Sequence, residues 1–245
     1  MPRFFSPAFA GKLPGDTVAL SPQDSAHARR SLRMNIGDTL DLCDEQGHDL
    51  AAHITAFSDD VVFAAVDSVC ESHSEPHTKV TLYQGLPKGD KFEQIIQKSV
   101  ELGVFEIVPV EMSRSIAKIG DKGDKKLARF QKIADEAAGQ SERGIKPAVC
   151  PPLSFKEAVA RIEKNGGKAL VCYERGGVPL HSVLSPADEA VSLVIGPEGG
   201  IAPEELQALQ NAGATAVTLG PRILRTETAP LAALAVVMDR TDNME

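Results

Sequence analysis

The sequence predicts an α/β fold with a parallel sheet in its C-terminal part, and three observations lead to this class. Apolar runs without charges, such as 191–195 and 214–219, have the composition of strands that are buried on both faces. Each run ends at a glycine-containing turn, and a segment with helical spacing of apolar residues follows it. Strand, helix and strand at these lengths form βαβ units, which require parallel pairing.

The first 73 residues follow another pattern and predict a small β domain. Short alternating or apolar runs are separated by turn residues and predict strands at 39–42, 49–55 and 61–69. Between the turns we expect one helix at 26–32, capped by Asp24 or Ser25. The polar, proline-containing stretch 71–77 has no apolar periodicity and is typical of a linker. The predicted domains are therefore 1–73 and 74–245.

The second domain alternates strands and helices from its first residues onward. Its expected elements are a strand at 79–83, a helix from Asp90, a strand at 104–110 ended by Pro109, a charged loop at 120–126, a helix at 127–138, a helix at 154–163 capped by Ser154 and a strand at 169–173. Three strand ends in this domain carry glycines, after Tyr173, Ile195 and Leu219. Because parallel strands end at one edge of a sheet, all three ends are expected to line one pocket.

Two of these turns lead into the last two helices. Gly196 to Gly200 precedes a helix in which Pro203 suits the first turn, where a missing N–H costs little. Gly220 and Pro221 precede a final helix that must begin near Glu227 or Thr228, because Pro230 fits only among the first positions. Residues 231–238 are apolar nearly all round, which predicts burial in the core or against a second subunit.

The loop 196–200 does not suit a phosphate ligand. It lacks the spacing of the dinucleotide-binding glycine motif, Pro197 removes one amide donor, and Glu198 would repel a phosphate group. Its glycines instead favour close approach of the backbone to an uncharged or cationic ligand. From spacing alone, two ordinary strand-to-helix turns are an equally good interpretation.

Composition excludes several classes of protein. No uninterrupted apolar stretch approaches the length of a membrane-spanning helix, and the first residues lack the pattern of a secretory signal. The four cysteines contain no C-x-x-C pair and show no ligand spacing with the six histidines, so we expect reduced core cysteines, no metal site and a cytoplasmic protein.

Charge is distributed unevenly along the chain, whose net charge is −8. Residues 1–78 carry 5 basic and 12 acidic side chains, residues 79–150 carry 13 and 10, and residues 151–245 carry 8 and 12. Any RNA contact must therefore be local. Arg29, Arg30 and Arg33 form a basic cluster in the otherwise acidic first domain, and the cluster is either a solvated helix face or a contact for RNA phosphates.

The paired runs IGPEGG at 195–200 and LGPRILRTETA at 219–229 resemble the motifs of the SPOUT class of methyltransferases. Within that class they are similar to the RsmE type, which methylates N3 of a uridine in 16S ribosomal RNA. HARRSLRM at 27–34, QKSVELGV at 97–104, Ser113-Arg114-Ser115 and EAAGQSERGIKP at 136–147 fit the same family, so the resemblance spans most of the chain. Gly139 and Pro230 depart from it, since the family has a larger residue and an alanine there.

The resemblance implies a C-terminal trefoil-knot domain with a parallel sheet, preceded by a PUA-like RNA-binding barrel. It also implies S-adenosylmethionine as the cofactor, a homodimer with cofactor pockets at its interface, and 16S ribosomal RNA or the assembled small subunit as the partner. The cofactor-binding residues are then Ile195, Gly196, Glu198, Gly199, Gly200, Leu219, Gly220, Ile223, Leu224 and Arg225. The RNA-binding residues are Arg29, Arg30, Arg33, Lys88, Lys91, Arg114 and Arg143.

Methylation at N3 requires loss of the N3 proton, and the resulting negative charge spreads onto O2 and O4 of uracil. Arg225 can stabilise that charge with two hydrogen bonds from its planar guanidinium, unless it only forms a salt bridge with Glu227 or the partner subunit. Glu227 can accept the proton, with Glu198 as the weaker candidate. Two other functions stay open: another SPOUT methyltransferase acting on ribose 2′-oxygen or transfer RNA, and a catalytically silent RNA-binding module.

Overall fold

The computed structural model describes residues 2–116 and 123–244 and divides the chain into two compact units. The N-terminal unit comprises Met1–Glu75 and Ala138–Lys146, and the C-terminal unit comprises Pro76–Ala137 and Pro147–Glu245. The division after residue 75 lies close to the predicted one after residue 73. The prediction missed that 138–146 belong to the first unit, because only tertiary contacts assign them there.

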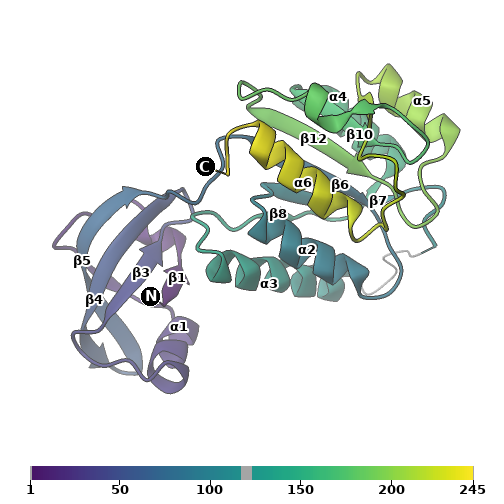
Figure 1. Ribbon diagram of the computed structural model, residues 1–245. Coiled ribbons are helices and arrows are strands. Elements are labelled where there is room, and N and C mark those ends of the chain that lie inside the picture. The colour runs from purple at the N-terminus through teal and green to yellow at the C-terminus, as the bar shows by residue number, and fades with distance from the viewer. Residues whose placement is uncertain (1, 117–122, 245) are drawn as a thin grey trace. The chain divides into compact units, whose positions relative to one another are not determined.

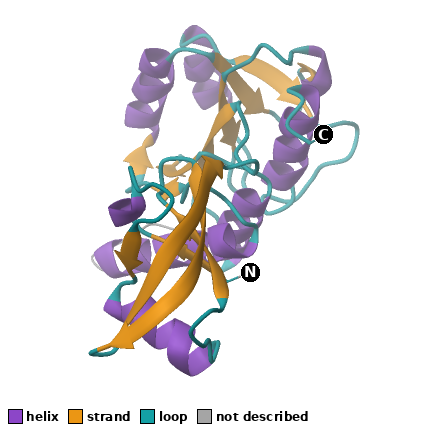
Figure 2. Ribbon diagram, turned by 90° about the vertical axis from the view of Figure 1, so that its left-hand side faces the viewer, coloured by secondary structure: helices purple, strands orange, loops and turns teal. Residues whose placement is uncertain are grey.

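The N-terminal unit is built on a mixed sheet with the order β1-β3-β4-β5-β2 (Figures 1 and 2). Its strands in the described part of the chain are β1 (Arg3–Phe5), β2 (Thr17–Ala19), β3 (Thr39–Cys43), β4 (His48–Ser58) and β5 (Val61–Glu71). The pair β1–β3 is parallel, whereas β3–β4, β4–β5 and β5–β2 are antiparallel. The two three-residue strands β1 and β2 were not predicted, because three residues are too few to display a period.

The helix of this unit starts earlier than predicted. Helix α1 (Pro22–Ala26) continues into a turn of π-helix at His27–Ser31, and the cap is Ser21, whose Oγ accepts a hydrogen bond from the Asp24 N–H at 3.1 Å. Ser21 followed by Pro22 is a strong start signal, since proline suits the first helical position. Ser25, one of the two predicted caps, is buried, and its Oγ donates to the carbonyl of Leu20 and accepts from the Val62 N–H.

The C-terminal unit contains an all-parallel sheet. Its order among the described residues is β11-β13-β10-β12-β6-β7-β8, with β9 paired to β7 beyond the end of β8. The strands are β6 (Lys79–Gly85), β7 (Glu106–Glu111), β8 (Ala148–Val149), β9 (Leu153–Ser154), β10 (Lys168–Cys172), β11 (Val178–Pro179), β12 (Ala190–Ile195) and β13 (Thr215–Thr218). The predicted parallel α/β fold is confirmed.

Helices cover both faces of this sheet (Figure 1). They are α2 (Lys91–Glu101), α3 (Gly123–Gln140), α4 (Phe155–Asn165), α5 (Pro203–Asn211) and α6 (Ala229–Arg240). Helices α4 and α5 pack on the face that presents Tyr83, Val171 and Val194, and α2 and α6 pack together on the other face. The predicted loop 120–126 falls partly outside the described residues, and its part from Gly123 onward belongs to α3.

Two sequence predictions about the core require correction. Pro109 does not end β7 but lies inside it, opposite Gln84 of β6. It is tolerated because its other side faces the break between β8 and β9, where no ladder bond needs its missing N–H. The four cysteines are free thiols, but Cys70 is exposed on β5 and is not a core residue.

Candidate active site

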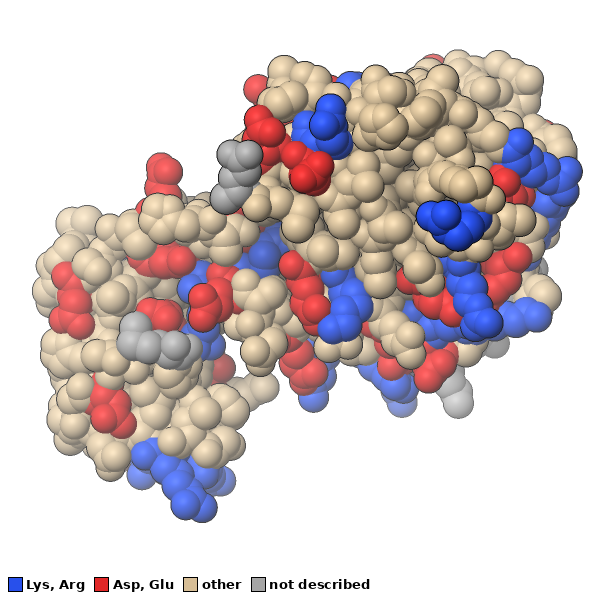
Figure 3. All heavy atoms as spheres, in the orientation of Figure 1, with Lys and Arg blue, Asp and Glu red and all other residues tan. Residues whose placement is uncertain are grey.

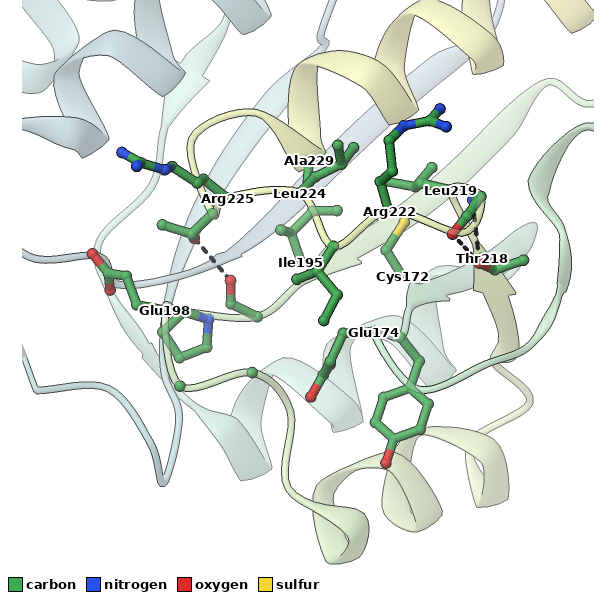
Figure 4. A pocket seen from close by; sticks show the side chains of 18 of the residues that line it. Cys172, Glu174, Ile195, Glu198, Thr218, Leu219, Arg222, Leu224, Arg225 and Ala229 are labelled. Carbon is green, nitrogen blue, oxygen red and sulfur yellow. Dashed lines mark hydrogen bonds between the residues drawn. The ribbon is translucent and has the colours of Figure 1, made fainter.

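A cavity of about 560 Å³ lies in the C-terminal unit at the carboxyl ends of β10, β12 and β13 (Figure 4). The ends are level, because Cys172 pairs with Ile195 on one side and with Val217 on the other. The turn after each strand contributes to the wall, as predicted from the three glycine-bearing strand ends. The lining residues are Lys91, 172–174, 195–200, 218–226 and Ala229.

The first glycine loop, 196–200, is packed tightly against its neighbours. A Cβ at Gly196 would lie 2.8 Å from Ile201, and one at Gly199 would lie 2.8 Å from the Cβ of Arg114. Gly200 has a φ of +70°, and a Cβ there would overlap the carboxylate of Glu174. These glycines therefore keep the loop close to its own scaffold, and Gly200 also adopts a conformation that side chains disfavour.

The second loop approaches the first through Thr226. Its hydroxyl donates to the carbonyl of Gly196 at 2.9 Å (Figure 4). It also accepts a hydrogen bond from Nε2 of Gln84 at 3.1 Å. Thr226 and Gln84 are both buried, so this bridge is shielded from water. Gly220 has a φ of +106°, and its N–H donates to the Thr218 hydroxyl at 3.2 Å. The bridge joins two loops that the sequence separates by about 30 residues.

A cation lies between two carboxylates at the rim of the cavity. Nζ of Lys91 is 3.1 Å from Oε1 of Glu198 and 3.3 Å from Oε2 of Glu227. The Glu198 carboxylate, followed by Glu227, raises the pKa of Lys91. Burial works against the charged form of Glu198, but the N–H groups of its own backbone and of Lys88, with the Lys91 ammonium, outweigh it and lower the pKa of Glu198. Glu198 is therefore an anion at neutral pH.

Glu227 and Gln84 each present a buried acceptor that is not satisfied. Oε2 of Glu227 and Oε1 of Gln84 accept no hydrogen bond from any described residue. Lys91 lies within ion-pairing distance of Glu227 Oε2 but outside hydrogen-bond geometry. A buried acceptor without a donor is unfavourable, and the charge of Lys91 offsets part of this cost at Glu227.

Arg225 contributes its backbone to the cavity, while its side chain points outward (Figure 4). The guanidinium is 83% exposed, and its nearest carboxylate oxygen is Oε1 of Glu227 at 4.0 Å. A contact of this length holds the side chain weakly. Ile223, two residues earlier, is also strongly exposed. This part of the second loop therefore presents an exposed cation and an apolar side chain to solvent.

All ten residues that were predicted to bind the cofactor line this one cavity. Sequence reasoning missed Cys172, Glu174 and Thr226 as individual contributors, and it placed Lys91 with RNA. Burial raises the pKa of the Cys172 thiol to about 12, so this residue offers only a neutral sulfur. The signal that could have identified Glu174 was its position directly after the predicted strand that ends at Tyr173.

The residues that were predicted to bind RNA fall into different environments. Lys88, Arg30 and Arg33 are exposed, whereas Arg29 pairs with Asp60 at 2.8 Å. Arg114 donates to the carbonyl of Gly199 at 3.1 Å and supports the first loop.

Arg143 requires a correction. It is 3% exposed, and two of its nitrogens donate to the Glu75 carboxylate at 2.8 Å. Glu75 also accepts from the N–H groups of Gly144 and Ile145. Arg143 therefore holds the segment 138–146 in the N-terminal unit and is not available to a phosphate group.

Within 2–116 and 123–244, no group of three or more His, Cys, Asp and Glu side chains is arranged to bind a metal ion. No helix in the same residues combines the length and the apolar character needed to cross a membrane.

The fold and the loops define the class of the C-terminal unit: the family model of the RNA methyltransferase domain matches residues 73–238. The chain is 36% identical over 234 residues to ribosomal RNA small subunit methyltransferase E of Bacillus subtilis, covering 92% of this chain and 91% of that one. A crystal structure of a ribosomal RNA small subunit methyltransferase E from Neisseria gonorrhoeae, bound to S-adenosyl methionine, matches with a TM-score of 0.87 and 35% identity over 98% of this chain and 97% of that one. The chain belongs to the ribosomal RNA small subunit methyltransferase E family. The resemblance stated from the sequence is thereby confirmed.

Proposed function

We propose that this protein transfers a methyl group from S-adenosylmethionine to N3 of a uridine in 16S ribosomal RNA. The observation that carries the proposal is the cavity at three level strand ends, walled by two glycine loops that Thr226 ties together. Membership of a family whose relatives are named small subunit methyltransferases supports the choice of reaction. Family membership is needed for this step, because the shape of a cavity alone does not identify the substrate.

The lining residues fit S-adenosylmethionine, which supplies a methyl group on a cationic sulfonium. The cavity volume of about 560 Å³ lies in the range of small-molecule sites. Ile195, Leu219 and Leu224 would offer apolar surface to the cofactor, while Glu174 and Glu198 supply negative charge that suits the sulfonium. A relative crystallised with S-adenosyl methionine supports the assignment.

Glu227 is the residue that we propose to accept the N3 proton. A neutral imide nitrogen shares its lone pair with the flanking carbonyls and attacks a methyl group well only after deprotonation. The unsatisfied Oε2 of Glu227 is a ready acceptor for the N3–H of uracil. The Lys91 ammonium lies 3.3 Å from this oxygen and would hold the carboxylate in place beside the base.

Arg225 is proposed to stabilise the negative charge on O2 or O4 of the deprotonated base. Its guanidinium cannot lose its proton, and its 83% exposure leaves it able to turn toward a base that enters from solvent. The alternative of a structural salt bridge to Glu227 or to a partner subunit remains the competing interpretation, and the 4.0 Å separation argues against a strong pair within one chain.

The N-terminal unit is proposed to be a PUA-like barrel that binds RNA. Arg30 and Arg33 are exposed and form no ion pair with any described residue, so they are the phosphate contacts that we propose, together with Lys88. In Figure 3 basic side chains gather at the end of this unit where α1 lies, and the rest of its visible surface carries mainly acidic groups. The partner is 16S ribosomal RNA, free or in the assembled small subunit, in the cytoplasm.

A homodimer with a trefoil-knotted C-terminal domain completes the proposal. Leu231, Ala232, Ala235 and Val236 form an apolar stripe on α6 that is only partly buried within one chain. A second copy of the chain would cover this stripe.

A methylation assay tests the proposed reaction. Full-length protein is incubated with labelled S-adenosylmethionine and either naked 16S RNA or assembled small subunits, and the RNA is digested to nucleosides. Label in 3-methyluridine is expected. Label in a 2′-O-methylated nucleoside, or label that appears only with transfer RNA, would instead establish another methyltransferase activity. A calorimetric titration with S-adenosylmethionine that shows no binding would favour a silent RNA-binding module.

Single-turnover rates test the roles of the two loop residues. Arg225→Ala is expected to reduce the rate by about 10²–10³, the effect of removing one oxyanion donor. Glu227→Gln should reduce it by about 10²–10⁴, because the amide cannot accept the proton as a base. Cofactor affinity and oligomeric state are measured in parallel. A near-parental rate in either variant would eliminate that role, and a monomeric Arg225→Ala would favour the structural salt bridge.

A further inference from the structure

A second cavity, of about 350 Å³, lies within the N-terminal unit and is not part of the cofactor site. Two stretches that are more than 100 residues apart in sequence form it. The first supplies Pro2, Arg3, Phe4, His27 and Leu32, and the second supplies Gly139, Gln140 and Glu142. The ion pair between Arg143 and Glu75 fixes the second stretch in this unit.

Gly139 leaves this cavity open. It is the penultimate residue of α3, and its φ is not positive, so the backbone conformation does not require glycine. A Cβ at this position would meet only Phe5 Cε2, at 3.8 Å, which is an ordinary contact. Glycine weakens a helix relative to any residue with an ordinary side chain. The structural effect of having glycine here is therefore the space that a larger side chain would fill.

The cavity is lined by an aromatic pair, an aliphatic side chain and polar side chains. His27 is exposed and packs edge-on against Phe4, with ring centroids 6.3 Å apart and an interplanar angle of 71°. Leu32 is 41% exposed and adds apolar surface to the cavity wall. The side chains of Gln140 and Glu142 are exposed and form no hydrogen bond with the described residues. A planar ligand with N–H and C=O groups along one edge matches this arrangement.

The cavity does not suit an isolated anion. The guanidinium of Arg3 is already bound to Asp49, and its Nε donates to the carbonyl of Arg143 at 3.0 Å. Glu142 adds negative charge. Cations are instead found outside, on the same short segment as His27 and Leu32: Arg30 and Arg33 form no ion pair with the residues described, whereas Arg29 is held by Asp60.

From these observations we infer that the cavity binds the base of an unpaired nucleotide in the RNA, while Arg30 and Arg33 bind the adjoining phosphates. The inference rests on the proposed function in that the substrate must be RNA. Unpaired bases are commonly stacked on aromatic side chains, histidine included, and read by hydrogen bonds along their edges. The site would thus anchor a nucleotide other than the methylated uridine, and position the RNA through the N-terminal unit.

The experiment compares two ligands of equal length and charge. Fluorescence anisotropy gives the affinity of full-length protein for a short single-stranded RNA and for an abasic RNA with the same backbone. The ratio of the two affinities isolates what the bases contribute. Gly139→Leu, which fills the cavity, should lower this ratio by about 5- to 100-fold, the range for one stacked base. Gly139→Ala is the matched control and should retain the ratio, since one methyl group leaves most of the cavity open.

A second pair of variants keeps the test valid if Gly139→Leu folds poorly. His27→Ala removes the exposed ring and should lower the same ratio, whereas His181→Ala, an exposed histidine of the C-terminal unit outside both cavities, should not. Arg30→Ala with Arg33→Ala should weaken both ligands equally and reduce the salt dependence of binding.

The outcomes separate this inference from the proposed function. If Gly139→Leu and His27→Ala discriminate between the two RNAs as the parent does, the cavity holds no base, although methylation by the parent can stand. If the parent binds the abasic RNA as well as the RNA with bases, the inference is also overturned. If the parent neither binds nor methylates RNA, the proposed function and the inference fail together. Affinity for S-adenosylmethionine is measured for each variant and should remain parental.

Discussion

Individual glycines in the two loops that wall the C-terminal cavity serve different physical purposes. Gly199 lies against Arg114, so a side chain there would displace the scaffold of the loop. Gly200 and Gly220 have positive φ, which an L-residue adopts at a cost. A Cβ at Gly220 would meet no atom within 4 Å. Loss of function at Gly220 would therefore come from backbone strain and from intrusion into the cavity, not from a clash with the protein.

Gly220→Val should weaken S-adenosylmethionine binding severely and lower the free energy of unfolding by about 1–3 kcal/mol, the usual cost of a strained backbone conformation. Gly213→Val is the matched control, because Gly213 also has positive φ and open space around it but lies after α5, outside the cavity. Calorimetric titration should show lost binding only in the first variant, with similar destabilisation in both. Equal cofactor affinity in the two variants would contradict the assignment of the second loop.

Lys91→Met should shift the acid limb of the pH–rate profile to higher pH. The ammonium is one of the groups that lower the pKa of Glu198, so its removal makes that carboxylate harder to ionise. We expect the single-turnover rate near pH 5 to fall by up to about tenfold and to recover as the pH is raised toward neutrality. Lys98→Met is the control, since Lys98 is exposed on the same helix but pairs with Glu101, outside the cavity. A rate reduced equally at every pH would indicate a purely structural role for Lys91.

Turns and helix ends show how single side chains stabilise whole elements. Ser154 begins α4 with a capping box, in which its Oγ accepts from the Glu157 N–H and the Glu157 carboxylate accepts from the Ser154 N–H. In the β3–β4 hairpin, Asp44 is 3% exposed and accepts from the N–H groups of Gln46 and His48 at 2.8 and 3.0 Å. Burial opposes the charge of Asp44, but these donors and the His48 ring outweigh it and lower its pKa.

Asp44→Asn should destabilise the N-terminal unit by about 1.5–3 kcal/mol at neutral pH, the range for hydrogen bonds to a charged group. Because the folded pKa of Asp44 is below its unfolded value, its stabilisation is complete above the unfolded pKa of about 3.9 and is lost as the pH falls through the folded value. The difference between parent and variant in urea unfolding should therefore be constant from about pH 5 to 8 and shrink below about pH 4.

Asp59→Asn is the control for that measurement. Asp59 has a φ of +47°, a conformation that asparagine tolerates, and its side chain makes no hydrogen bond with the described residues. Its stability profile should follow that of the parent. A constant difference between parent and Asp44→Asn down to pH 2 would show that the carboxylate charge is not what the hairpin uses.

At the scale of the whole molecule, the two units contribute different chemistry. The C-terminal unit holds the cofactor cavity, and the N-terminal unit holds the second cavity and the exposed arginines. The partly buried stripe of Leu231, Ala232, Ala235 and Val236 shows that α6 is not fully covered within one chain. Its apolar character is the reason to expect a second subunit there.

Val236→Glu should convert a dimer into monomers, because a charged carboxylate would be buried without a partner in the interface. Light scattering after size exclusion measures the mass, and cofactor affinity should fall if the interface completes the pocket. Gln210→Glu, on an exposed position of α5, introduces the same side chain outside the stripe and should leave the mass unchanged. A parent that is already monomeric, or a Val236→Glu variant that remains dimeric, would refute the predicted interface.

The sequence by itself determined the features that depend on neighbouring residues. Ser154 caps α4, Thr228 precedes α6 with Pro230 in its first turn, and buried apolar runs define β10, β12 and β13. The level ends of parallel strands then follow from sheet geometry, so the ten cofactor-loop residues could be expected in one cavity. Local propensity and period carry this information, because each signal lies within a few residues along the chain.

Only the tertiary structure decided the roles that depend on distant partners. Lys91 meets Glu198 across 107 positions, Arg143 is buried against Glu75, and Thr226 joins the loops through Gly196. Pro109 is tolerated inside β7 because the neighbouring ladder is interrupted beside it. From the sequence alone, a charged side chain is predicted to be exposed, because no neighbouring residue shows which distant counterion it will pair with. Burial, ion pairing and the cavity beside Gly139 arise from packing between segments, and packing is settled only when the whole chain folds.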